Sequence, residues 1–171
     1  MSEVSADQAG TLVLSLRAAG IRCWVMGGWG IDALVGRQTR THHDLDLLVH
    51  VDDLPALDEW LQCQGFRRQF EWEESRPVQR AGRRYDTAFV ETHTDGLELD
   101  VHAVLDGAGR NPVLLTTDPW TLPLDALTGA GQIGTVDVPC VSRAAQRAMH
   151  EGYELPDKHV QDLALIGQQP S

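Results

Sequence analysis

The chain has 171 residues, of which 42% are apolar. A chain of this length buries roughly 70% of its unfolded surface, enough for one compact domain without disulfides or a structural metal. No apolar run approaches the ~20 residues of a membrane span, and the start, MSEVSADQ, lacks the order of a secretion signal. The cysteines at 23, 63 and 140 are odd in number and widely spaced. We therefore expect a single domain over 1–171 in the cytoplasm, with no membrane contact.

The net charge argues against nucleic-acid binding. The formal net charge is -11 and the sequence pI is about 4.9. A protein that binds DNA or RNA needs a basic surface to displace counterions, so we expect no DNA partner. An acidic surface attracts cations instead, either metal ions or a cationic organic substrate.

The first half of the chain alternates helical and strand patterns. A single apolar stripe follows Ser5, and a buried strand pattern runs directly into two glycines. The expected elements are a helix from Ser5 to Gly20, a strand over 21–26, a short helix over 29–35 closed by Gly36, a strand over 44–49, and a helix that begins at Asp52 or Asp53 and ends at Gly65.

The second half contains strands followed by helices. Residues 105–130 hold several Gly and Pro and are expected to be mostly loop. The other expected elements are strands over 66–70, 85–91 and 97–104, a hairpin over 131–140 with Gly134 near its turn, a helix from Ser142 to about Gly152, and a last helix over about 156–166. This order predicts an α+β fold with helices on a mixed sheet, and a C-terminal helical part over about 140–171.

Two aspartates in the segment HHDLDLLV carry the first chemical signal. In a strand, Asp44 and Asp46 point to the same face with Cα atoms roughly 6.6 Å apart. Two neighbouring carboxylates repel each other unless a cation lies between them. Magnesium suits this position because it prefers oxygen ligands and keeps substrate phosphates among its other ligands.

A third aspartate lies in the strand LELDVHAV, whose apolar residues alternate with Glu98, Asp100 and His102. If this strand neighbours the first one, Asp100 completes a cluster with Asp44 and Asp46. Three carboxylates can hold two magnesium ions, which stabilise the attacking and leaving oxygens of a phosphoryl displacement.

Gly27 and Gly28 form a candidate phosphate cradle. They follow a strand and open a helix, so backbone N–H groups are free to bind an anion. The sequence is neither a Walker A loop nor a GxGxxG motif. Arg37 and Arg40, in the next loop, are candidates to neutralise triphosphate charge.

These motifs together resemble a known family. The run WVMGGWGIDALVGRQTRTHHDLDLLV is similar to the small antibiotic nucleotidyltransferases, particularly the lincosamide nucleotidyltransferases and their relatives that act on the 2″-hydroxyl of aminoglycosides. LELDVHAV matches the family's strand with a third aspartate, and the tail VPCVSRAAQRAMHEGYELPDKHVQDLALI resembles the lincosamide-type ending. The shared residues of the first block are Gly27, Gly28, Trp29, Gly36, Arg37, Arg40, His42, Asp44, Leu45 and Asp46.

The resemblance implies a polymerase-β-like nucleotidyltransferase fold and transfer of AMP from ATP, or of another nucleoside monophosphate, to a hydroxyl of an antibiotic. Lincosamide is favoured over aminoglycoside, and a homodimer is a possible assembly. Asp44 and Asp46 would hold Mg²⁺, while Asp100 would complete the metal site or deprotonate the acceptor hydroxyl. The implied nucleotide contacts are Gly27, Gly28, Arg40, His42, Tyr153 and Lys158.

Other interpretations stay open. A toxin-like enzyme of the same superfamily would modify tRNA or protein, although the acidic balance disfavours tRNA. A nucleotide-binding module without catalysis would not need three converging acids. The adjacent His42 and His43 do not have the spacing of a zinc site. The cluster Glu71–Trp72–Glu73–Glu74 is either a solvated loop or a surface for a cationic substrate.

Overall fold

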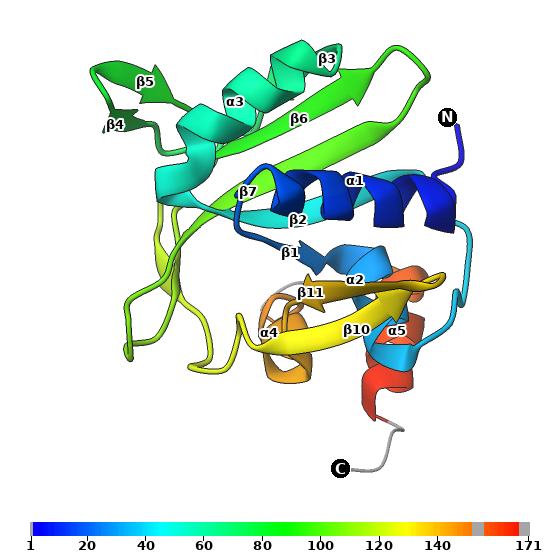
Figure 1. Ribbon diagram of the computed structural model, residues 1–171. Coiled ribbons are helices and arrows are strands. Elements are labelled where there is room, and N and C mark those ends of the chain that lie inside the picture. The colour runs from blue at the N-terminus through cyan, green and yellow to red at the C-terminus, as the bar shows by residue number, and fades with distance from the viewer. Residues whose placement is uncertain (1, 152–155, 168–171) are drawn as a thin grey trace.

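The structure is a computed structural model that describes residues 2–151 and 156–167. A mixed sheet of nine strands forms its centre (Figure 1), and seven of them lie in the order β10-β11-β1-β2-β7-β6-β3, with β8 attached to β7 and β9 to β8. The strands are β1 (Cys23–Met26), β2 (Asp44–His50), β3 (Phe66–Glu71), β6 (Ala88–His93), β7 (Glu98–Leu105), β8 (Val113–Leu114), β9 (Trp120–Thr121), β10 (Gly129–Ile133) and β11 (Val136–Cys140), and a separate hairpin consists of β4 (Val78–Arg80) and β5 (Arg83–Tyr85).

Helices cover the sheet in two groups. Helices α1 and α3 lie in front of the sheet in Figure 1, whereas α2, α4 and α5 gather near β10 and β11 and contact one another. Ser5 caps α1, as the sequence predicts, and the structure adds a reciprocal capping box with Gln8. The helices are α1 (Ala6–Ala18), α2 (Gly27–Val35), α3 (Leu54–Cys63), α4 (Arg143–Ala148) and α5 (Asp157–Gly167), and a 3-10 turn, η1 (Val51–Asp53), precedes α3.

Alternation along β2 and β7 separates the core from the polar face. Leu45 and Leu47 of β2 point into the main core with Leu99 and Val101 of β7, and all four are fully buried. Leu48 points to the opposite face, into a smaller apolar cluster. Asp44 and Asp46 share that second face because residues two apart in a strand point the same way. The predicted α+β arrangement with a mixed sheet is confirmed.

The register of the two central strands places the acids side by side. Strands β2 and β7 are parallel, and Asp46 lies opposite Asp100 while Asp44 lies opposite Glu98. Strand β1 pairs with the other edge of β2 in antiparallel register, with Met26 opposite Asp46. The residue after Met26 is Gly27, so the glycine corner begins directly beside the acidic face.

Some predicted boundaries are wrong. Helix α2 begins at Gly27 and not at Trp29. The strand predicted over 85–91 is divided, because Tyr85 ends the β4–β5 hairpin and β6 begins only at Ala88. That hairpin turns at Ala81 and Gly82, both with positive φ.

The C-terminal third follows the prediction more closely. The hairpin of β10 and β11 turns at Gly134, which has a φ of 59°. Ser142 caps α4, and this helix ends at Ala148, before the predicted end at Gly152, which lies outside the described residues. The predicted loop over 105–130 contains the short strands β8 and β9. Among the described helices, none is long and apolar enough to cross a membrane.

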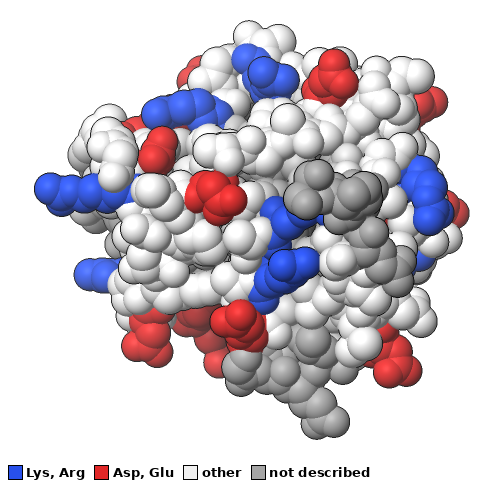
Figure 2. All heavy atoms as spheres, turned by 90° about the horizontal axis from the view of Figure 1, so that it is seen from below, with Lys and Arg blue, Asp and Glu red and all other residues white. Residues whose placement is uncertain are grey.

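Charged side chains of both signs are interspersed on the face seen from below in Figure 1. Figure 2 shows basic side chains near its middle with acidic side chains beside them, and the described part of this face carries no extended basic surface. This distribution agrees with the net charge of -11.

Candidate active site

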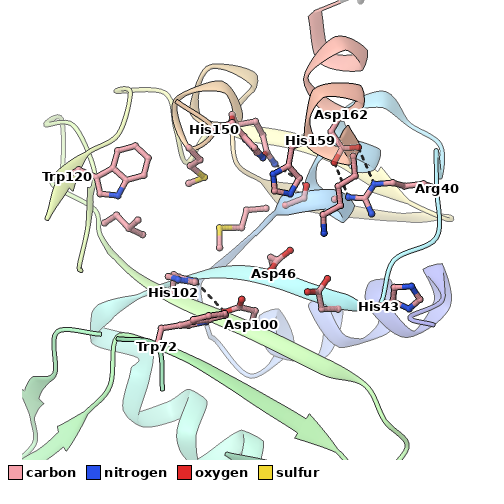
Figure 3. Close-up of a pocket in the computed structure, with 18 residues that line it drawn as sticks. Arg40, His43, Asp46, Trp72, Asp100, His102, Trp120, His150, His159 and Asp162 are labelled. Carbon is pink, nitrogen blue, oxygen red and sulfur yellow. Dashed lines mark hydrogen bonds and ion pairs between the residues drawn. The ribbon is translucent and has the colours of Figure 1, made fainter. Parts of the chain in front are cut away.

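A cavity of about 590 Å³ lies over the acidic face of β2 and β7 (Figure 3). Its volume is within the range of small-molecule sites. Asp44, Asp46 and Asp100 form one wall, and the glycine corner borders it. Arg40 lies across the cavity from this wall. Lys158 also lines the cavity, and the positive charges of both side chains act on Asp46.

Two carboxylates of the acidic wall, those of Asp46 and Asp100, have raised pKa values. Burial, followed by the negative charges of Asp44 and Asp100, raises the pKa of Asp46 well above its ordinary value. Burial also raises the pKa of Asp100, against the opposing effects of His102 and a hydrogen bond from Trp72. A divalent cation would relieve the repulsion between these carboxylates, so this donor set fits Mg²⁺. Within the described residues, no three acidic, His or Cys side chains are already gathered closely enough to hold a metal ion.

Gly27 is required by the position of Asp46. A Cβ at residue 27 would overlap the carboxylate of Asp46, and Gly27 has a φ of 61°, where only glycine is free of strain. The backbone of the corner therefore lies directly against one of the candidate metal ligands.

Gly28 has an equally close environment. A Cβ there would lie 2.6 Å from Nη2 of Arg40 and 2.5 Å from Nδ1 of His42. These contacts bring the loop after α2 back over the first turn of the helix. The absence of a side chain at both glycines thus allows Asp46, Arg40 and His42 to lie against the backbone of the corner. The N–H groups of the two glycines lie at a helix N-terminus, where anions bind.

A buried network supports this corner from below. Asp32 and His42 are 2% and 3% exposed, and Nε2 of His42 lies 2.5 Å from Oδ2 of Asp32. Thr39 donates its hydroxyl to Oδ1 of the same aspartate at 2.5 Å. The imidazole of His42 also contacts the ring of Trp29, with centroids 4.5 Å apart. His42 is therefore a supporting residue in this structure, and its predicted contact with the nucleotide stays a prediction.

Helix α5 supplies the cationic side of the cavity. Lys158 is exposed and lines the cavity, and it is the only lysine of the chain. Arg40 makes a forked pair with the buried Asp162, at 3.2 Å from Nε and 2.9 Å from Nη2. Asp162 thereby holds the guanidinium beside Gly28. The sequence offered no sign of this partner, because 122 residues separate it from Arg40.

The opposite end of the cavity centres on Asp100. Nε1 of Trp72 donates a hydrogen bond to Oδ1 of Asp100 at 3.0 Å. Nδ1 of His102 lies 3.5 Å from the same oxygen, and its Nε2 lies 3.7 Å from Oε1 of Glu74. Part of the segment Glu71–Glu74 therefore belongs to the cavity wall.

An apolar and histidine-rich wall completes the cavity, and none of the predicted site residues belongs to it. Trp120 of β9 comes from the segment expected to be loop, and Met149 follows α4. His150 and His159 contact each other edge to face with ring centroids 4.8 Å apart. No local motif marks these residues, because they meet only when α4, α5 and β9 converge.

The structure thus brings together Asp44, Asp46, Asp100, Gly27, Gly28, Arg40 and Lys158 around one cavity. Arg37 is exposed and does not line it. Tyr153, the remaining predicted nucleotide contact, lies outside the described residues. The roles assigned to all these residues stay predictions.

A glycine corner against paired strand carboxylates, on a mixed sheet, agrees with the nucleotidyltransferase that the sequence predicts. The family model of aminoglycoside-2″-adenylyltransferases matches residues 11–166, and the chain belongs to this family. The predicted family and the predicted enzyme class are confirmed.

Curated and solved relatives agree with this assignment. A lincosamide resistance protein from Staphylococcus haemolyticus is 24% identical over 134 residues, which is 78% of this chain and 76% of that protein. The crystal structure of the lincosamide antibiotic adenylyltransferase LnuA, lincomycin-bound, superposes with a TM-score of 0.80 at 20% identity, over 98% of this chain and 99% of that one. ANT(2″)-Ia in complex with adenylyl-2″-tobramycin gives a TM-score of 0.67 at 24% identity, over 91% and 86% of the two chains. The predicted polymerase-β-like fold is confirmed by these nucleotidyltransferase neighbours.

Proposed function

We propose that the protein transfers AMP from ATP, in the presence of Mg²⁺, to a hydroxyl group of a small-molecule antibiotic, and that the antibiotic is a lincosamide. The family match supports the adenylyl group as the transferred unit. The similarity to a lincosamide resistance protein supports the acceptor class. An aminoglycoside acceptor is the alternative, and membership of the aminoglycoside-2″-adenylyltransferase family supports it.

One observation carries the proposal: Asp44, Asp46 and Asp100 share one face of two paired strands, directly beside Gly27. Asp44 and Asp46 would hold Mg²⁺, with Asp100 at the edge of the same site. Bound there, Mg²⁺ would neutralise phosphate charge that builds up on the leaving group.

The environments of the acids separate two sides of the reaction. The positive charges of Lys158 and Arg40, on the cationic side of the cavity, partly offset the rise in the pKa of Asp46. The rise in the pKa of Asp100 is instead partly offset by His102 and by the hydrogen bond from Trp72, at the other end. We assign the triphosphate to the first side, where Gly28, Arg40 and Lys158 surround it. The acceptor then lies on the side of Asp100.

The transfer of AMP uses residues on both sides of the cavity. The acceptor oxygen attacks the α-phosphorus of ATP, a new P–O bond forms, and the bond to the β-phosphate oxygen breaks so that pyrophosphate leaves. Asp100 accepts the proton of the acceptor hydroxyl, because its carboxylate faces that side. Arg40 and Lys158 stabilise the departing pyrophosphate by charge-assisted hydrogen bonds.

Mass spectrometry tests the proposal. Purified protein is incubated with ATP, Mg²⁺ and either lincomycin, clindamycin or an aminoglycoside panel. We expect one adenylyl group on a lincosamide and no product with EDTA or with Asp46→Asn. Product only on an aminoglycoside would overturn the lincosamide assignment. Product on tRNA or protein, with none on any drug, would overturn the antibiotic assignment.

A further inference from the structure

Two exposed aromatic rings meet at the end of β3, and one of them, Trp72, lines the cavity. Phe70 and Trp72 are 40% and 37% exposed. Their rings meet edge to face, with centroids 4.8 Å apart and an interplanar angle of 86°. Neighbouring exposed aromatics are a feature of binding surfaces, because they offer a large apolar area with little conformational freedom to lose.

The backbone fixes the position of Trp72. Its N–H donates to the carbonyl of Ala88 at 3.0 Å, and its carbonyl accepts from the N–H of Ser75 at 3.0 Å. The residue is therefore tied to β6 on one side and to a turn on the other. Figure 3 shows the indole beside Asp100, across the cavity from Arg40 and Asp162.

The hydrogen bond from Trp72 selects one oxygen of Asp100. Oδ1 accepts from Nε1 of Trp72 at 3.0 Å, and Nδ1 of His102 lies 3.5 Å from the same atom. Among the described residues, none donates a hydrogen bond to Oδ2. The side chain of Asp100 is 14% exposed, so the solvent that can compete for these contacts is limited.

We propose that Trp72 is a positioning and specificity residue for the acceptor. Its N–H holds Oδ1 of Asp100, so that Oδ2 is presented to the attacking hydroxyl, and its exposed ring supports the C–H face of a saturated, hydroxyl-bearing ring such as a sugar. This inference rests on the proposed function. One side chain would thus both orient the carboxylate of Asp100 and help to select the substrate that receives AMP.

Two substitutions separate the parts of this role. Trp72→Phe keeps an aromatic ring and removes the N–H donor, whereas Trp72→Gln keeps an N–H donor and removes the ring. For Trp72→Phe we expect kcat to fall about tenfold or more, as for loss of a hydrogen bond to a charged group. The acceptor KM should stay within about threefold, because ground-state binding is retained.

Trp72→Gln should show the opposite pattern. Its acceptor KM should rise about tenfold, the loss of a well-packed aromatic contact, while kcat falls less than in Trp72→Phe. The ATP KM should change less than about twofold in both variants, because Trp72 lies on the acceptor side. Trp60→Phe is the matched control, since Trp60 is a partly exposed tryptophan that contacts Phe66 away from this cavity.

The outcomes are distinct. If Trp72→Phe keeps the kcat and acceptor KM of the wild type, the inference is wrong. It is also wrong if both variants lose thermal stability and ATP affinity together, because Trp72 would then be a structural residue. If the wild type itself transfers AMP to no acceptor, the proposed function fails, and the inference fails with it. Differing kcat and KM effects in the two variants, with an unchanged Trp60→Phe, would support it.

Discussion

Asp46 is held in an unfavourable environment by its neighbours. Burial and the charges of Asp44 and Asp100 raise its pKa in the folded chain above the ordinary value of 3.8. Between these two pKa values the folded chain binds more protons than the unfolded chain, so stability falls as the pH rises through this window. At neutral pH, the metal-free protein therefore carries an electrostatic penalty at its most important residue.

Asp46→Asn should remove this penalty and the activity together. We expect a higher melting temperature than the wild type in EDTA at pH 7, because the amide carries no charge. This gain in melting temperature should disappear below about pH 4, where the carboxyl of Asp46 in the wild type is protonated in both the folded and the unfolded chain. AMP transfer should fall by about a thousandfold or more. Thermal unfolding from pH 3 to 8 measures the first effect, and a lower melting temperature for Asp46→Asn at pH 7 would contradict it.

Lys158 allows a second test at a single residue, because it is the only lysine in the sequence. We expect Lys158→Ala to raise the ATP KM about tenfold, the effect of a lost charge-assisted hydrogen bond. Arg37→Ala is the control, since Arg37 is exposed and outside the cavity, and should stay within about twofold. An amine-specific reagent should modify Lys158, and ATP with Mg²⁺ should protect it. Labelling unaffected by ATP would place the nucleotide elsewhere.

At the scale of elements, the start of α2 can be tested by two matched glycines. Gly27 is the first residue of this helix and Gly36 follows its last residue. Their φ values are 61° and 82°, so alanine at either site meets similar backbone strain, about 1–2 kcal/mol. Only at Gly27 would the added Cβ overlap Asp46, whereas nothing lies within 4 Å at Gly36. We expect Gly36→Ala to lose stability and keep its activity, and Gly27→Ala to lose both. Equal kcat values for the two purified variants would show that the contact with Asp46 is unimportant.

The elements that sequence patterns predicted best are those with a strict period. Alternation in LELDVHAV predicted that Asp100 and His102 share the polar face of β7, and the register of β2 and β7 agrees. Ser5 and Ser142 marked helix starts because their hydroxyls accept hydrogen bonds from the first turn.

Other features could not be predicted, either because the segment is too short for a periodic signal or because the contact is made only in the folded chain. The hairpin of β4 and β5 has three residues in each strand and turns at Ala81 and Gly82, too short for a periodic signal. Two contacts form because α2 and α5 pack against the loop over 36–43. Arg40 of this loop pairs with Asp162 of α5, and His42 of the loop pairs with Asp32 of α2. The sequence indicated Arg40 and His42 without indicating their partners.

At the scale of the whole molecule, the cavity divides into a charged end and an aromatic end. Asp46 and Arg40 belong to the first, together with Lys158, whose charge acts on Asp46, and Trp72 and Trp120 belong to the second. A chain with a net charge of -11 repels free ATP, so binding of the nucleotide should depend on the accompanying cation.

Metal removal should therefore act on stability as well as on activity. With ATP and Mg²⁺ at about a hundred times Kd, a ligand that binds only the folded chain stabilises it by about 2.7 kcal/mol. This corresponds to a rise in melting temperature of about 5–10 °C for a chain of this size. We expect ATP with EDTA to give less than half of the shift, measured by differential scanning fluorimetry. An equal shift without the metal would argue against carboxylates that bind the nucleotide through a cation.

A crystal structure with Mg²⁺ and a non-hydrolysable ATP analogue is the decisive measurement for this site. We expect Mg²⁺ bound by carboxylate oxygens of Asp44 and Asp46, with Asp100 at the edge of the same site, and the triphosphate along Gly27 and Gly28 towards Lys158. A nucleotide bound outside this cavity, or a metal held by other residues, would contradict it.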